Sequence, residues 1–129
     1  MKIKVPLLAA VAMAGFVSAN AQPSNLNVVP TTLSVSIGAT AAFRVTGAGA
    51  APFSYQWWFT NASGPSPINA VENPSAQRGI LNLTNVQVAS AGGYYAVVAD
   101  ANGLSTTSPI ATLEVDPTFM KVTLAQVRQ

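Results

Sequence analysis

Leu-Asn-Leu-Thr-Asn-Val-Gln-Val-Ala-Ser-Ala-Gly-Gly-Tyr-Tyr-Ala-Val-Val-Ala, residues 81–99, is the stretch that decides the fold. Apolar residues alternate with polar ones from Leu81 to Val86, small residues follow at 89–93, and a second alternating run opens at Tyr94. Alternation of this kind predicts strands. A tyrosine just past a glycine corner buries its ring and turns its hydroxyl back toward the backbone of the corner. The stretch therefore predicts two strands joined by a corner that Tyr94 closes.

Further alternating segments lie on both sides of this stretch. They cover residues 26–29, 33–37, 41–45 and 104–115. Pro30 and Pro109 interrupt two of these runs, and Asp100–Gly103 is a hairpin turn signal, because Asn and Gly tolerate a positive φ. Short strands with turn signals every 8 to 12 residues, roughly, predict an all-β sandwich.

The most aromatic segment is Phe-Ser-Tyr-Gln-Trp-Trp-Phe at 53–59. Successive side chains of a strand point to opposite faces. Tyr55, Trp57 and Phe59 therefore share one face, and Trp58 lies on the other. Three aromatic rings on one face predict the core, with Trp57 at its centre.

The N-terminus has the features of a secretory signal peptide. Lys2 and Lys4 precede an apolar run at 5–17, and small residues follow at Ser18–Ala21. That run is shorter than the roughly 20 residues that a membrane-spanning helix needs. We therefore expect a secreted, periplasmic or cell-surface protein that contacts a membrane only through the signal segment before its cleavage. The expected divisions of the chain are a signal peptide helix at 1–21, a domain at 22–116, and a linker or overhanging strand at 117–129.

Composition removes several function classes. The formal net charge is +2 at pH 7, but Lys2 and Lys4 belong to the signal segment, and without them four basic residues face four acidic ones. A mature chain of zero net charge predicts no nucleic-acid partner. Cysteine and histidine are both absent. The chain therefore has no disulfide and lacks the commonest general base and metal ligand.

The sequence contains no constellation of catalytic or metal-binding residues. Serine and threonine are plentiful but have no activating base beside them. Glu114 and Asp116 share a face at the end of a strand, which is typical of solvated edge charges. Asp100 and Asn102 offer far fewer oxygens than the roughly six to eight that Ca²⁺ takes. The sequence therefore predicts a protein that is not an enzyme, with no catalytic residue, no cofactor and no metal site.

Residues 25–115 resemble the immunoglobulin-like domains, in the cysteine-free I-set-like form of bacterial exported proteins. The family motif Asp-x-Gly-x-Tyr-x-Cys is matched here by the run that begins at Ser90. Gly92 and Tyr94 agree with the motif, whereas Ser90 and Ala96 stand where the family has aspartate and cysteine. The resemblance implies an all-β, immunoglobulin-like two-sheet Greek-key sandwich of about seven to eight strands.

The resemblance also implies which residues form the structural core. Val45 falls at the position of the family's first cysteine, Trp57 at its core tryptophan, and Leu83 in the strand before the corner. Tyr94 and Ala96 complete the set. Val45 and Ala96 must fill by apolar packing the space of a disulfide whose loss typically costs about 2 to 5 kcal/mol.

Trp58 and Tyr95 form the candidate partner-binding site. Each follows a residue expected in the core, so both side chains point outward, and the family places their two strands side by side in one sheet. An exposed pair of rings suits a protein partner or a stacked sugar ring. In the alternative interpretation, Trp58 only packs beneath the loop at 60–77 or against an adjacent domain.

The resemblance implies a non-catalytic exported module for protein interaction, adhesion or domain spacing at the cell surface, with a protein or glycan partner. One alternative is a carbohydrate-binding module, which the Trp58 and Tyr95 rings favour. Another is the N-terminal piece of a larger exported protein whose activity lies beyond Gln129.

Overall fold

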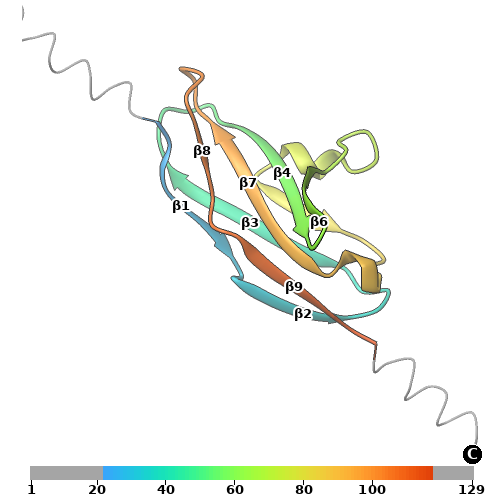
Figure 1. Ribbon diagram of the computed structural model, residues 1–129. Helices are drawn as coiled ribbons and strands as arrows, with labels where there is room; N and C mark the ends of the chain where they lie inside the picture. The colour runs from blue at the N-terminus through green and yellow to red at the C-terminus, as the bar shows by residue number, and fades with distance from the viewer. Residues whose placement is uncertain (1–21, 118–129) are drawn as a thin grey trace, which may run out of the picture.

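The computed structural model describes residues 22–117, which form two β-sheets packed face to face (Figure 1). The expected signal segment at 1–21 and the tail from 118 onward lie outside the described residues. The strands are β1 (Ser24–Val29), β2 (Thr32–Ser36), β3 (Ala41–Ala48), β4 (Ser54–Asn61), β5 (Gly64–Pro67), β6 (Ile80–Leu83), β7 (Gly92–Ala99), β8 (Ser105–Thr107) and β9 (Ala111–Asp116). Two short 3-10 helices are η1 (Pro74–Gln77) and η2 (Val88–Ser90).

The described chain has nine strands, so the predicted number of seven to eight is too low. Two breaks at proline account for part of the difference. Pro30 separates β1 from β2, and Pro109 lies between β8 and β9. Proline has no N–H to donate to a ladder. Each of these runs therefore becomes two strands. β1 and β2 pair with strands of different sheets, whereas β8 and β9 both pair with β7.

The two sheets differ in size. The smaller has the order β1-β3-β6, and the larger has the order β2-β9-β7-β4-β5, with β8 paired to β7. β2 and β9 are parallel, and all the other pairs are antiparallel. The N-terminal strands β1 and β2 thus belong to different sheets, on either side of Pro30.

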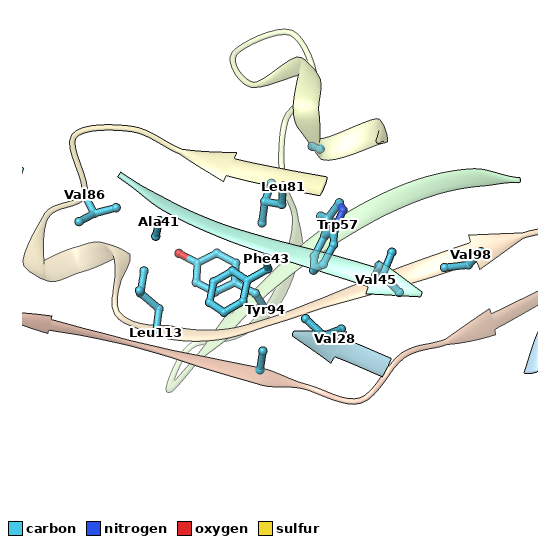
Figure 2. Close-up of a cluster of buried hydrophobic side chains, with 13 residues drawn as sticks. Val28, Ala41, Phe43, Val45, Trp57, Leu81, Val86, Tyr94, Val98 and Leu113 are labelled. Carbon is cyan, nitrogen blue, oxygen red and sulfur yellow. The ribbon is translucent and has the colours of Figure 1, made fainter. Parts of the chain in front are cut away.

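The core lies between the sheets (Figure 2). Trp57 is fully buried, and its indole Nε1 donates a hydrogen bond of 2.7 Å to the carbonyl oxygen of Arg78. The Tyr94 ring stacks on Phe43 at 5.5 Å between ring centroids and meets Phe59 at 5.0 Å. The buried apolar residues are Val28, Ala41, Phe43, Val45, Trp57, Ala76, Leu81, Val86, Tyr94, Ala96, Val98, Ala111 and Leu113.

Four of the five expected core residues are buried in this cluster: Val45, Trp57, Tyr94 and Ala96. Leu83 is only half-buried and packs against this cluster. It is the last residue of β6 and has the same parity as the buried Leu81, so its side chain lies on the core-facing side at the end of the strand.

The corner before β7 has the predicted geometry. The Tyr94 hydroxyl donates to the carbonyl oxygen of Ser90 at 2.6 Å, which confirms that it reaches back to the corner. Gly92 allows the close approach of β4, because a β-carbon there would lie 2.8 Å from the carbonyl oxygen of Thr60. This corner therefore holds the start of β7 against the core.

Two outer strands have protected edges. Ser75 of η1 lies against β6, where the Asn82 N–H donates to its Oγ at 2.8 Å. On the larger sheet, β5 forms the outer edge beside β4. The Ile68 N–H points toward β4, because it donates to the carbonyl oxygen of Trp57 at 3.0 Å. Every second backbone nitrogen along a strand points to the same side, so the ring nitrogens of Pro65 and Pro67 face away from β4, and the outer edge has no N–H donor at these two positions.

Candidate interaction face

Trp58 and Tyr95 lie directly opposite each other on the neighbouring strands β4 and β7. Their chain neighbours Trp57 and Tyr94 are buried between the sheets, so the two side chains project from the outer face of the larger sheet. Both are half-buried. Their rings stack, with centroids 6.1 Å apart and planes inclined by 8°. The structure thus brings the predicted pair together on one surface.

The pair belongs to an apolar row that crosses the sheet. Pro67 on β5 lies opposite Trp58. On the other side, Tyr94 lies opposite Ala111, so the same register carried one residue further places Ile110 opposite Tyr95. Ile110 is 59% exposed. The row Pro67, Trp58, Tyr95 and Ile110 therefore offers apolar surface to solvent.

An open groove of about 460 Å³ lies along this row. Trp58, Tyr95, Pro109 and Ile110 contribute to its lining, and no charged or carboxamide side chain does. Ser108 is the most buried hydroxyl in the groove, and it is already engaged, because it accepts from the Ala96 N–H and donates to the carbonyl oxygen of Pro109. The groove thus combines apolar walls with few free polar groups.

Sequence reasoning identified the ring pair but missed the rest of this surface. Ile110 follows the break at Pro109 and belongs to no strand, so alternation does not place its side chain. Gly93 leaves room for it, since a β-carbon there would lie 2.7 Å from Ile110 Cγ2. Gly93, directly before Tyr94, is the residue in the sequence that could have indicated space for a side chain at this position.

The acidic residues considered for chemistry have structural partners. Asp100 Oδ1 accepts from the N–H groups of Asn102 at 2.9 Å and Leu104 at 3.1 Å, as expected of a hairpin turn. Glu114 accepts from the Ser34 hydroxyl at 2.9 Å. Within residues 22–117, no group of three or more Asp, Glu, His or Cys side chains could hold a metal ion. The same residues contain no helix long and apolar enough to cross a membrane.

No family model matches the sequence, and no curated protein matches it. Its fold is similar to solved structures. The crystal structure of the N-terminal four Ig domains of Dscam1 isoform 1.9 matches with a TM-score of 0.56 and 20% identity, covering 73% of this chain and 22% of that chain. Isoform 4.44 matches with a TM-score of 0.55 and 20% identity, covering 73% and 21%.

The chain spans about a fifth of the length of these solved chains. Matches extend to 1375 solved chains, so the architecture alone does not single out a function. At 20% identity the similarity concerns the fold. The described domain is an all-β, two-sheet structure with an immunoglobulin-like fold.

Proposed function

We propose that this chain is an exported, non-catalytic immunoglobulin-like module of the cysteine-free type, and that it binds a protein partner through the outer face of its larger sheet. The observation that carries the proposal is the stacked pair of Trp58 and Tyr95, half-exposed beside an uncharged groove. Aromatic side chains dominate the binding energy of protein interfaces, because they bury large apolar areas with few rotatable bonds. A cleaved signal at 1–21 and a domain at 22–116 are parts of the same proposal.

The lining of the groove favours a protein partner over a sugar. The Trp58 and Tyr95 rings are nearly parallel, with centroids 6.1 Å apart, and the groove beside them has mostly apolar walls. A sugar needs hydrogen-bonding groups around the ring, and the polar side chains that line the groove carry only hydroxyls, of Thr60, Tyr95, Thr107 and the already bonded Ser108. Apolar side chains of a protein match these walls better.

The placement of the chain ends supports a role within a string of domains. β1 begins near one end of the elongated domain, and β9 finishes at the other (Figure 1). Neighbouring domains joined at both ends would extend along one axis and leave the sheet faces open. The proposal therefore includes domain spacing at the cell surface as well as adhesion.

A cell-binding experiment tests the proposed partner class. The fluorescently labelled protein is added to intact cells of the source organism, with and without protease treatment or periodate oxidation of surface glycans. We expect saturable binding that protease removes and periodate leaves unchanged. Trp58→Ala and Tyr95→Ala should each weaken binding about tenfold or more, as expected for central aromatic residues.

Val29→Ala is the matched control, because Val29 is 49% exposed and lies on the smaller sheet. It should bind like the unaltered protein. Unchanged binding by both aromatic variants would overturn the proposed face. Loss of binding after periodate treatment alone would instead make the module a carbohydrate binder.

A further inference from the structure

A second depression lies on the opposite side of the sandwich and collects positive charge. Arg44 on β3 and Arg78, just before β6, both line an open pocket of about 450 Å³. They are the only two cationic residues of the described range 22–117, and both side chains are exposed. Tyr55, Ile80 and Asn82 contribute further walls.

Strand register places the two arginines on one face. Arg44 lies opposite Ile80, and the Val45 N–H donates to the carbonyl oxygen of Gly79 at 3.0 Å, which carries the pairing one residue beyond β6. Arg78 is extended, with φ −125° and ψ 166°, so it continues this register diagonally to Arg44. Diagonal neighbours in a sheet lie roughly 7 to 8 Å apart, within reach of long side chains.

No acidic side chain lines the Arg44–Arg78 pocket itself. Glu72 lines the adjoining depression together with Arg78 and Asn82. The other carboxylates of residues 22–117 belong to the larger sheet, with Asp100 directly after β7 and Glu114 and Asp116 on β9. Two cations facing one pocket repel each other, and a bound anion removes that repulsion.

We propose that the Arg44–Arg78 pocket binds the carboxylate of an acidic sugar polymer. Guanidinium groups match a carboxylate with paired N–H donors. Tyr55 reaches the pocket beside Gly79, where a β-carbon would lie 3.6 Å from the tyrosine Oη. Ile80 is 45% exposed and supplies an apolar wall. The pocket thus offers charge, an aromatic hydroxyl and apolar surface together.

The neighbouring backbone favours a sugar over an acidic peptide. An extended peptide would gain most of its hydrogen bonds by adding to the free edge of β6. At Asn82 that edge is occupied, since the Asn82 N–H donates to Ser75 Oγ and the Asn82 carbonyl oxygen accepts from Asn73 Nδ2 at 2.8 Å. Ile80 is then the one residue of β6 whose outward backbone groups an added strand could pair with. Recognition at this pocket therefore depends on side chains.

Trp57 provides a reporter for the test. Its indole N–H is bonded to the carbonyl oxygen of Arg78, directly beneath the pocket. The chain has two tryptophans, so Trp58→Phe leaves Trp57 as the one tryptophan, which can be excited selectively at a wavelength where tyrosine does not absorb. Titration of this variant with trigalacturonate should give a saturable change in emission, and neutral galactotriose should give none.

Substitutions in the same background test the two arginines. Arg44→Gln and Arg78→Gln should each weaken trigalacturonate binding about tenfold or more, since each removes one charged donor pair. Arg128→Gln is the matched control, because it removes the same charge from the tail. It should bind within about twofold of the parent. Both pocket residues are exposed, so an unchanged thermal midpoint should show that folding is preserved.

Several outcomes would overturn the proposal. These are equal weakening by Arg128→Gln, absence of saturable binding by both fluorescence and calorimetry, and equally tight binding of hexaglutamate. The result is separable from the protein-binding face, because Trp58→Ala should lose the cell partner and keep trigalacturonate. The two binding sites are therefore tested independently of each other.

Discussion

Tyr94 combines an apolar contact and a polar one in a single side chain. Its ring lies between Phe43 and Phe59 in the core, while its hydroxyl donates to the carbonyl oxygen of Ser90. Burial raises the pKa of Tyr94 to about 12. The protonated form is therefore the one that the folded state favours.

This shift predicts a loss of stability in strong alkali. The folded pKa lies above the ordinary tyrosine value of 10.0, so the contribution of Tyr94 is complete below pH 10 and is lost as the pH rises toward 12. Urea unfolding should report a fall in the free energy of unfolding of about 1 to 2 kcal/mol over that window, because solvent screens part of the effect.

Tyr94→Phe is the control for this titration. It should lose about 0.5 to 1.5 kcal/mol at neutral pH, because the Ser90 carbonyl loses its donor. Between pH 10 and 12 its stability should fall less than that of the unaltered protein, because the hydroxyl with the raised pKa is absent. Parallel pH curves for the two proteins would contradict the assigned role.

At the residue scale, the sequence predicts which side chains of one strand share a face. The alternation of residues 53–59 predicts that Trp57 points into the core and that Trp58 points outward. In the structure Trp57 is fully buried and Trp58 is half-exposed on the outer face. Arg78 could not be placed in this way, because it precedes β6 and its face depends on pairing with β3. Tertiary pairing therefore decides which charges meet.

At the scale of elements, η1 acts as a cover for the edge of β6. The Ser75 hydroxyl accepts from the Asn82 N–H and also donates to Asn73 Oδ1 at 2.6 Å. Ser75 is 9% exposed, so little water reaches this bond. A polar side chain thus satisfies a backbone group that a neighbouring strand would otherwise bind.

Ser75→Ala should open this edge. Leaving the Asn82 N–H without its partner should cost about 1 to 3 kcal/mol. Hydrogen–deuterium exchange should speed up at Asn82 more than at Phe43 in the middle of β3. Uniform acceleration at both amides would indicate general destabilisation and not a local role.

Strand breaks were visible in the sequence, but their consequences were not. Pro30 and Pro109 marked interruptions, yet alternation does not tell that β1 and β2 join different sheets. The groove beside Tyr95 has the same origin, because Ile110 lies outside any strand and fills the space above Gly93. The alternation of apolar and polar residues predicts the strands. The positions of the segments between strands depend on how the side chains of the folded domain pack together.

At the scale of the whole molecule, one core joins both sheets. Phe43 and Leu81 come from the smaller sheet, and Trp57 and Tyr94 come from the larger (Figure 2). The bond from Trp57 to Arg78 also links β4 to the segment that leads into β6. The two layers should therefore unfold together.

Urea unfolding of the Trp58→Phe variant checks this cooperativity. Trp57 emission and far-ultraviolet circular dichroism should give the same midpoint, because one reports the core and the other the strands. A Trp57 transition at lower urea would mean that the core loosens while the sheets persist. The transition should also be unaffected by reducing agents, since the chain contains no cysteine.

The two prolines of β5 affect how neighbouring copies behave at high concentration. Pro65 and Pro67 turn their nitrogens toward solvent at the rim of the larger sheet, where other residues would present hydrogen-bond donors. A strand from another molecule finds few donors there, so fibril growth across this rim is disfavoured. At high concentration, molecules can then contact one another through their sheet faces without pairing strands across the outer edge of β5.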